Sequence, residues 1–511
     1  MKYLEYYKKK ILRAEDVKKI IGKLPRKKKV ILCHGVFDIV HPGHVRHLAY
    51  AKSKADILIV SITADQFVKK GIYRPHIPEG LRALNLAVFD FVNYVIIDSN
   101  TKPLKIINLL KPDFYAKGFE YANVNKFSAT KEENILLKKI GSKMIFTPGD
   151  VVYSSSKILN NEQPNLKYEK LSDLILKNKK ISFDGLLKSL DKIKNIKVHV
   201  IGDTIVDTFT YGTNIGGQTK TPTLSIKYLY ENSFVGGAAI VSRHLSKAGA
   251  SVTFTSLIGE DFLGNFVKSE LKKDKIKFNI ITEKGRPTTN KNLINCASHR
   301  LVKLDKVDNS PINQLSFQKI TSYIKKIKAD IVIFSDFRHG IFNQNTIQQF
   351  SEAINKKSLK VADSQLASRW GNISQFQKFD LITPNEKEAR FTIGSQDSAV
   401  GYLANAVLKT AKAKNIILKL GEKGILALDN NNNYFSLDSF CGNLKDAVGA
   451  GDALLAYSSL VYFKSKSLFE ASLIGSLAAA LECEKEGNIP INIHEIKKKL
   501  IDIKNKINFI E

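Results

Sequence analysis

Cysteine is scarce in this chain of 511 residues, and the patterns that cysteine would have to form are missing as well. The four cysteines are far apart and include no CxxC pair. A disulfide framework or a zinc cluster needs closely spaced sulfur ligands, so we expect neither. Isolated thiols in apolar surroundings are typical of a reducing compartment, and the sequence therefore predicts a cytoplasmic protein.

Long apolar runs are also absent. No segment offers the ~18 uninterrupted apolar residues that a membrane span requires. The first residues, MKYLEYYKKK, carry charge but are not followed by the apolar core of a signal peptide. We therefore expect no membrane insertion.

The formal net charge of +30 would suit a nucleic-acid-binding protein. Most of the basic residues are lysines, however, and they are spread along the whole chain. A nucleic-acid footprint needs a basic patch with arginines and aromatic side chains that contact phosphates and bases. A solvated lysine-rich surface is the favoured interpretation, no nucleic-acid partner is expected, and nucleic-acid binding is the lesser alternative.

Short β-branched runs alternate with amphipathic helical stretches along most of the chain. From Lys29 the runs VILCHGVF, ADILIVSIT, VNYVIID, PDFYAKG and SKMIFTP are typical of strands. The alternation restarts at VHVIGDTIVD, after a helical segment rich in Lys, Asn and Asp. It predicts an α/β fold with parallel sheets, divided into a domain at 1–160, a linker with covering helices at 161–195 and a larger domain at 196–511.

Four of the ten histidines lie in the stretch HGVFDIVHPGHVRHL, residues 34–48. This stretch follows an apolar strand and opens a helix, whose free N–H groups and dipole favour a phosphate. His41 and His44 stand at the helix start and could donate hydrogen bonds to an α-phosphate under attack. His34 is a candidate helper, and His47 is expected to be structural. A zinc site is the less favoured alternative, because no Cys or carboxylate stands at ligand spacing beside the pair.

This region resembles the nucleotidylyltransferases with the HxGH signature, in particular the cytidylyltransferase-like group, over residues 29–160. GIYRPHIPEGLRALNLA, KGFEY and VYSSSKI look like further blocks of that group. The resemblance implies a small Rossmann-like fold in which His41 and His44 are catalytic and hold the nucleotide phosphates. It also implies nucleotide contacts from His34, Gly35, Phe37, Arg82, Lys117, Ser154, Ser155 and Ser156. Positive charge around two phosphorylated substrates would come from Lys69, Arg74, Arg82 and Lys117.

A second phosphate-handling pattern lies near the carboxyl end, at DAVGAGDALLAY, residues 446–457. Its glycines allow consecutive N–H groups to point at one oxyanion. Asp452 stands at a helix start, where it could take a proton from an attacking hydroxyl. Such a turn is a weak signal alone, but the chain also contains VGGAA, TPNEKE and LGEKG, and the four blocks together make a specific pattern.

These blocks resemble the ribokinase-like (PfkB) carbohydrate kinases over residues 196–511. The resemblance implies an α/β kinase with a small β lid, with ATP and Mg²⁺ as cofactors and Asp452 as the catalytic base. The implied sugar-side residues are Asp203, Asp207, Gly236, Gly237, Lys291, Arg300 and Asp305. The implied residues near the metal and the ATP phosphates are Asn385, Glu388, Gly421, Gly449, Ala450 and Gly451.

Three positions depart from that family's usual pattern. Ile240 stands where the motif GGAAN would place an asparagine, so one polar contact near the sugar is missing. Ala447 replaces a hydroxyl residue. The segment VADSQ stands where heptose-specific members have Asp-Pro-Lys, which leaves the sugar open.

A carbohydrate kinase joined to a nucleotidylyltransferase predicts synthesis of a nucleotide-activated sugar. The combination resembles the ADP-heptose synthases of lipopolysaccharide biosynthesis, with the domain order reversed. It implies ATP-dependent phosphorylation of a heptose-like sugar or sugar phosphate at its anomeric hydroxyl. Nucleotidyl transfer from ATP or CTP to the sugar 1-phosphate would follow, with release of pyrophosphate. The expected partners are a sugar phosphate, nucleoside triphosphates and a second copy in a homodimer. The alternative is a monofunctional nucleotidylyltransferase with a degenerate or regulatory kinase domain.

Overall fold

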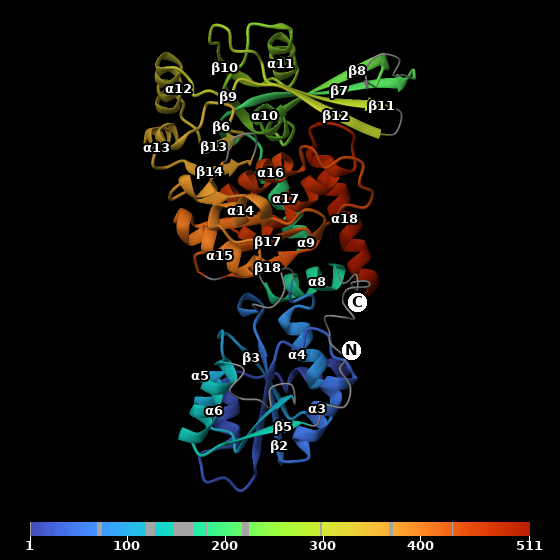
Figure 1. Ribbon diagram of the computed structural model, residues 1–511, viewed down its shortest axis with the longest axis vertical. Coiled ribbons are helices and arrows are strands. Elements are labelled where there is room, and N and C mark those ends of the chain that lie inside the picture. The colour runs from blue at the N-terminus through green and yellow to red at the C-terminus, as the bar shows by residue number, and fades with distance from the viewer. Residues whose placement is uncertain are drawn as a thin grey trace. The chain divides into compact units, whose positions relative to one another are not determined.

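The computed structural model describes residues 2–68, 74–118, 128–147, 167–178, 181–216, 224–296, 299–366, 371–431 and 433–510 (Figure 1). These residues form two compact units: the first comprises the described residues up to 165 together with Asp397–Tyr402, and the second comprises the rest. Four of the sequence-predicted site residues lie outside the described residues: Lys69, Ser154, Ser155 and Ser156.

The first unit is built on a parallel sheet in the order β3-β2-β1-β4-β5. The strands are β1 (Val30–Gly35), β2 (Ile57–Thr63), β3 (Tyr94–Asp98), β4 (Phe114–Gly118) and β5 (Lys143–Thr147). The helices are α1 (Lys2–Lys8), α2 (Ala14–Ile21), α3 (Pro42–Lys52), α4 (Glu79–Ala87), α5 (Leu104–Leu110) and α6 (Ser128–Lys139). The chain runs outward from β1 to β3 and then returns to place β4 on the other side of β1. The carboxyl ends of β1 and β4 therefore form a topological switch point, where ligands bind in open α/β sheets.

Helices cover both faces of this sheet, because alternate apolar residues of β1 need to be buried on each face. Ile31 and Cys33 belong to the core that α3 and α4 share with one face. Val30 and Leu32 belong to the core that α2 and α5 share with the other. A strand buried on both faces needs a continuous apolar run instead of an alternating one.

The second unit is built on a sheet in the order β10-β9-β6-β13-β14-β15-β16-β17-β18, parallel as far as β16 and antiparallel beyond it. The strands are β6 (Lys197–Gly202), β9 (Ser251–Leu257), β10 (Lys277–Ile281), β13 (Ile331–Asp336), β14 (Leu359–Ser364), β15 (Leu381–Ile382), β16 (Asn415–Lys419), β17 (Ile425–Asp429) and β18 (Tyr434–Leu437). The helices are α8 (Lys167–Lys177), α9 (Phe183–Lys192), α10 (Ala238–Lys247), α11 (Phe262–Lys273), α12 (Gln314–Lys326), α13 (Gln344–Ala353), α14 (Glu386–Ile393), α15 (Val400–Ala411), α16 (Ala450–Ser465), α17 (Leu468–Cys483) and α18 (Ile493–Ile510).

A separate four-stranded sheet, the lid sheet, projects from this second unit (Figure 1). Its strands are β12 (His299–Lys306), β11 (Asn290–Cys296), β7 (Thr204–Asn214) and β8 (Ile226–Gly237), in that order. β12 is exposed along its whole length, whereas most of β7 is buried. The small β lid implied by the sequence is therefore present, and the predicted α/β fold is confirmed.

The segment predicted as a linker contains α8 and α9, so its predicted helices are present. Leu171, Leu186 and Leu190 of these helices join the main apolar core of the second unit. α16 and α17 run through the same core and are buried along most of their length. None of the helices in the described part of the chain is long and apolar enough to cross a membrane.

Candidate active sites

The HxGH motif stands where β1 ends and α3 begins, at the switch point of the first sheet. His41 caps α3, and its Nδ1 accepts a hydrogen bond from the Gly43 N–H at 3.2 Å. Pro42 occupies the first helical turn, where it removes no hydrogen bond that the helix needs. The His41 and His44 rings stack with centroids 3.9 Å apart, and the Phe37 ring lies 5.0 Å from that of His44. The structure therefore brings the two predicted catalytic histidines together.

Burial keeps these imidazoles neutral. It lowers the pKa of His44 to about 4, with further lowering by His41 and His47, and it also lowers the pKa of His41. The His44 Nδ1 is buried and has no hydrogen-bond partner among the described residues. A buried polar atom without a partner is costly, so this nitrogen is suited to a ligand that completes its hydrogen bonding.

The predicted helper His34 is engaged by the neighbouring strand. Its Nδ1 lies 3.0 Å from the Ser61 hydroxyl and its Nε2 lies 3.2 Å from the Thr63 hydroxyl. Burial, aided by the charge of Lys117, lowers the pKa of His34 to about 4. In this arrangement His34 links β1 to β2, while its predicted nucleotide contact stays a prediction. His47 lies 2.9 Å from the Thr147 hydroxyl, as a structural role requires.

Arg82 is fully buried and holds the loops around the motif. Its guanidinium donates to the carbonyls of Val36, Thr63 and Ile77 and to the Asp65 carboxylate at 2.6 Å. Four partners engage all the nitrogens of this group, so the structure gives Arg82 an architectural role. Its predicted nucleotide contact is untested.

Lys117, at the end of β4, donates to the Thr130 hydroxyl at 3.0 Å and to the Glu133 carboxylate at 2.5 Å. Burial raises the pKa of Glu133, although Lys117 acts in the opposite direction. Sequence reasoning missed Glu133, because no motif includes it.

Arg74 lies 3.9 Å from the Asp38 carboxylate, which in turn accepts from the His76 and Ile77 N–H groups.

In the second unit, the glycine-rich turn leads into α16. Gly449 caps this helix at a φ of 82°, a left-handed conformation that glycine adopts without strain. Asp452 lies in the first turn and is buried, and its Oδ1 has no partner among the described residues. Burial and the nearby Asp363 carboxylate raise the pKa of Asp452 well above its ordinary value. A carboxylate with a raised pKa is matched to accept a proton from a hydroxyl near neutral pH.

A buried ion pair that sequence reasoning missed lies beside this turn. The Lys419 ammonium donates to both Asp363 oxygens, at 2.8 and 3.0 Å, and the Thr383 hydroxyl donates to the same carboxylate at 3.0 Å. A Cβ at Gly451 would lie 3.2 Å from the Lys419 Nζ, so the turn passes directly over the cation. Asp363 lies within the departing segment VADSQ, and Lys419 directly precedes LGEKG. These neighbouring motifs are the only features of the sequence that could have pointed to the ion pair.

Asn385 and Glu388 form a reciprocal cap at the start of α14. The Glu388 oxygens accept from the Asn385 N–H at 2.6 Å and from its side-chain amide at 2.5 Å, and the Glu388 N–H donates back at 2.9 Å. Burial raises the pKa of Glu388 to about 7, against the opposing charge of Lys419. A cation bound nearby would stabilise the ionised Glu388 carboxylate and offset the effect of its burial.

The sugar-side residues gather at the lid sheet. Lys291 of β11 stands opposite Asp207 of β7, and its ammonium lies 5.8 Å from the centre of the Phe337 ring. Asp203 accepts from the Phe337, His339 and Ile341 N–H groups, at 3.0, 3.2 and 3.4 Å. Asp203 thus holds the loop after β13, and its predicted sugar contact is untested.

The remaining predicted residues are more dispersed. The exposed Arg300 approaches the buried Asp446 at 3.7 Å, and Asp305 stands opposite Lys291 on β12. Gly236 and Gly237 end β8 at the start of α10, and Gly421 begins a short 3₁₀ turn. The departing residue Ile240 is fully buried in α10, whereas Ala447 is exposed. Burial explains why an apolar side chain is accommodated at position 240.

Residues 195–494 match the family model described as pfkB family carbohydrate kinase, which covers more than half of the chain. The chain belongs to the pfkB family of carbohydrate kinases. Residues 32–161 match a second model, described as cytidylyltransferase-like. Both domain types inferred from the motifs are confirmed, with the cytidylyltransferase-like domain preceding the pfkB domain.

Among curated proteins the chain is similar to several named bifunctional protein HldE. The relative from Campylobacter curvus is 27% identical over 313 residues, which are 60% of this chain and 65% of that protein. The relative from Aliarcobacter butzleri is 28% identical over 310 residues, 59% of this chain and 64% of that protein. The chain thus spans less than two thirds of the length of these relatives.

Among solved structures, phosphofructokinase-2 from Escherichia coli in complex with potassium matches with a TM-score of 0.52 and 19% identity. That match covers 61% of this chain and 99% of the other. Ribokinase from Thermotoga maritima matches with a TM-score of 0.50 and 21% identity, covering 60% of this chain and 99% of the other. These likenesses establish the fold of the pfkB domain.

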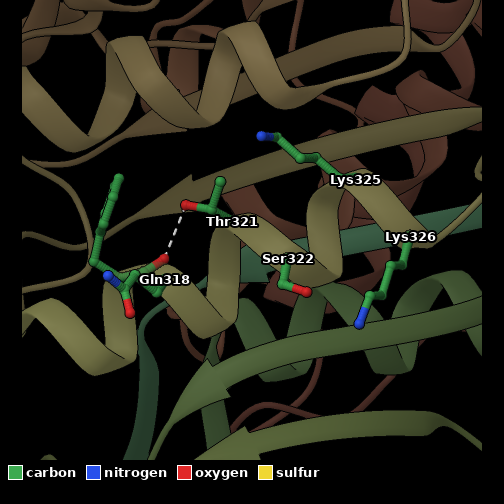
Figure 2. A pocket seen from close by; sticks show the side chains of 6 residues that line it. Gln318, Thr321, Ser322, Lys325 and Lys326 are labelled. Atoms are coloured by element: carbon green, nitrogen blue, oxygen red, sulfur yellow. Dashed lines mark hydrogen bonds between the residues drawn. The ribbon is translucent and has the colours of Figure 1, made fainter.

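One hollow of about 310 Å³ lies outside these sites, on α12 of the pfkB domain. Figure 2 shows that side chains of this single helix line it, among them Gln318, Thr321 and Lys325. It contains none of the sequence-predicted site residues.

Proposed function

We propose that the protein makes a nucleotide-activated sugar in two steps. The pfkB domain would phosphorylate a sugar or sugar phosphate with ATP, and the cytidylyltransferase-like domain would couple a sugar 1-phosphate to a nucleotide. A sugar phosphate acceptor would give a bisphosphate, whose other phosphate a separate phosphatase would have to remove between the two steps. The observation that carries this proposal is the buried Asp452 at the start of α16, which lies in the same chain as the paired His41 and His44.

In the first step Asp452 would remove the proton of the acceptor hydroxyl. The N–H groups of Gly449, Ala450 and Gly451 would face the charge that accumulates on the transferred phosphoryl group. The Lys419 ammonium, held beneath this turn by Asp363, adds fixed positive charge without needing to move.

Mg²⁺ is the metal that this proposal requires. It is usually bound by one or two carboxylates, several waters and the substrate phosphates instead of a cage of protein ligands. In the described part of the chain there is no cluster of three or more His, Cys, Asp or Glu side chains that could hold a metal. Glu388 and Asn385 both offer oxygen atoms, and the buried Glu388 carboxylate would be stabilised by a cation. They therefore fit a site in which Mg²⁺ is held by one carboxylate, waters and the substrate phosphates. When bound there, Mg²⁺ would neutralise charge on the ATP phosphates.

In the second step His41 and His44 would donate hydrogen bonds to the α-phosphate of a nucleoside triphosphate at the start of α3. The α-phosphate becomes more negative as the sugar 1-phosphate attacks it and pyrophosphate leaves, so donors aimed at it lower the barrier. Neutral imidazoles at this position each retain one N–H for that purpose.

The finer assignments belong to this proposal as well. The name HldE, which the relatives carry, and the resemblance to ADP-heptose synthases support a heptose-like acceptor and a role in lipopolysaccharide biosynthesis. ATP or CTP would be the nucleotidyl donor, and anomeric phosphorylation follows from the need for a sugar 1-phosphate. We also propose a cytoplasmic location and a homodimer.

The deciding experiment is a product screen by mass spectrometry. The full chain is incubated with heptoses, hexoses and their phosphates, together with ATP alone or with ATP and CTP. The expected product has the mass of a nucleotide-sugar, and its mass identifies both the sugar and the base. Failure to form any nucleotide-sugar from supplied sugar 1-phosphates would refute the second step, and the absence of both products would refute the whole proposal.

A further inference from the structure

The side chain of Asn488 lies between two motifs that are distant in the sequence. Its Nδ2 donates to the Asp207 carboxylate at 2.7 Å, and the residue is 2% exposed. A Cβ at Gly449 would lie 2.5 Å from the Asn488 Oδ1. A Cβ at Gly236 would lie 2.2 Å from the Asp207 Oδ2 and 2.9 Å from the Asn488 Nδ2. The pair of Asn488 and Asp207 therefore accounts for glycine in both the VGGAA and GAGD motifs.

The two residues before Asn488 also contact the lid sheet. The Tyr211 hydroxyl of β7 donates to the Glu486 carboxylate at 2.7 Å. Gly487 has a φ of 76°, and a Cβ there would lie 2.6 Å from the Phe234 ring of β8. Three successive residues that follow α17 thus pack against β7 and the edge strand β8 of the lid sheet.

Asn488 also compensates a buried charge. Burial raises the pKa of Asp207, whereas Lys291 and the Asn488 amide lower it. The amide therefore favours the ionised carboxylate and fixes the direction in which its second oxygen points. Removing the amide would leave a buried carboxylate oxygen without its donor, which disfavours the ionised form of Asp207.

We propose that Asn488 is a positioning residue of the phosphoryl-transfer site, which orients Asp207 toward the acceptor sugar and holds the lid sheet against the start of the Gly449 turn. This inference rests on the kinase step of the proposed function. Asn488 does not touch the reacting atoms and acts through Asp207.

The first test compares Asn488→Ala with a matched variant, Asn415→Ala. Asn415 is also buried, and its amide donates to the Asp380 carbonyl and the Tyr462 hydroxyl, both at 2.7 Å. For Asn488→Ala we expect the KM for the acceptor found in the product screen to rise about tenfold to a hundredfold, with the KM for ATP within about twofold. Asn415→Ala should lower thermal stability and leave both KM values unchanged. Equal effects of the two variants on the acceptor KM would overturn the proposal.

Should the alanine variant fail to fold, Asn488→Leu has nearly the same shape and lacks the donor at every pH, so it serves as the second variant. A double-mutant cycle then tests whether Asn488 acts through Asp207. In an Asp207→Asn background, the Asn488 substitution should add less than about a twofold effect, because its partner is already altered. A full effect in both backgrounds would contradict the proposed route.

The last readout is independent of turnover. Without Asn488, amides of β7 should exchange with deuterated solvent faster than in the wild type, and Asn415→Ala should leave β7 unchanged. If the wild type phosphorylates no sugar in the screen, the proposed function fails, and the exchange data still decide whether Asn488 holds the lid sheet. Unchanged exchange in β7 would refute that role.

Discussion

The two candidate sites are assembled in opposite ways. At the HxGH motif, His41 and His44 lie within one turn of α3, and helix geometry alone brings their rings to 3.9 Å. At the GAGD turn, Asp452 interacts with Asp363 of β14 and Lys419 of β16, which only the sheet brings alongside α16. A site on one helix start is visible in the sequence, whereas a site collected from several strands is only partly visible.

Burial also acts in opposite directions at the two sites. It lowers the pKa of His44 and raises the pKa of Asp452, because a buried group favours its neutral form. The histidines are thereby kept as neutral hydrogen-bond donors. The raised pKa of Asp452 means that its ionised carboxylate binds a proton more tightly than an ordinary aspartate does. The same physical cause thus prepares one site for binding charge and the other for accepting a proton.

The largest expected effect separates the two activities. Asp452→Asn should reduce sugar phosphorylation by about 10²–10⁴-fold, because the base is lost while the shape is kept. Nucleotidyl transfer to a supplied sugar 1-phosphate should stay within about twofold, as for distant, independent sites. Steady-state rates of both reactions are measured, with the exposed Asp502→Asn as the control. A loss of both activities would show that the two sites are not independent.

The buried ion pair should dominate the stability of the second site. Lys419→Met leaves Asp363 buried without its cation, so the free energy of unfolding should fall by about 3–5 kcal/mol. Lys414 pairs with Asp380 at 2.8 Å, but its side chain is 64% exposed. Lys414→Met should therefore cost only about 0–1 kcal/mol. Urea unfolding followed by circular dichroism compares the two, and similar costs would contradict the assignment of Lys419 as a buried structural cation.

At the first site the corresponding change is His44→Ala. Nucleotidyl transfer should fall by about 10²–10³-fold, since one donor to the developing phosphate charge is removed. Sugar phosphorylation should be unaffected. His47→Ala, on the same helix, removes the contact to Thr147 and should affect stability more than rate. Pyrophosphate release is measured for both variants, and an equal loss of rate in each would remove the distinction between His44 and His47.

The remaining comparison concerns the pH dependence of the two reactions. The raised pKa of Asp452 means that this carboxyl is protonated at pH values where an ordinary aspartate is ionised. Below that pKa, kcat/KM for sugar phosphorylation should rise by about tenfold per pH unit as the base forms. The pKa of His44 is about 4, so this imidazole is already neutral near pH 6 and nucleotidyl transfer should change little above it. Rate profiles over roughly pH 4 to 9 test both expectations, and a phosphorylation rate that rises at the pH where an ordinary aspartate ionises would refute Asp452 as a base with a raised pKa.

Local patterns in the sequence were enough to predict the α/β fold, and the family resemblances of the motifs implied the lid and both domain types. The apolar run in β1 and the helix start at Pro42 depend on neighbouring residues, so single-sequence reasoning finds them. Asp363, Lys419, Glu133 and Asn488 carry no such pattern. Their partners lie far away in the sequence, and only the packed sheets bring them together.

The sequence by itself determined the two candidate phosphate-binding positions, because a glycine-rich or histidine-flanked helix start is a local feature of consecutive residues. Only the tertiary structure decided which charges surround those helix starts. It buried Arg82 among backbone carbonyls and tied Asp203 to the loop after β13, while the predicted ligand contacts of both residues stay predictions. It also joined Asp207, on the lid strand β7, to Asn488, which follows α17. Burial and pairing are properties of the packed chain. They set the pKa of each ionisable group, its orientation, and which of its polar atoms remain available to a ligand.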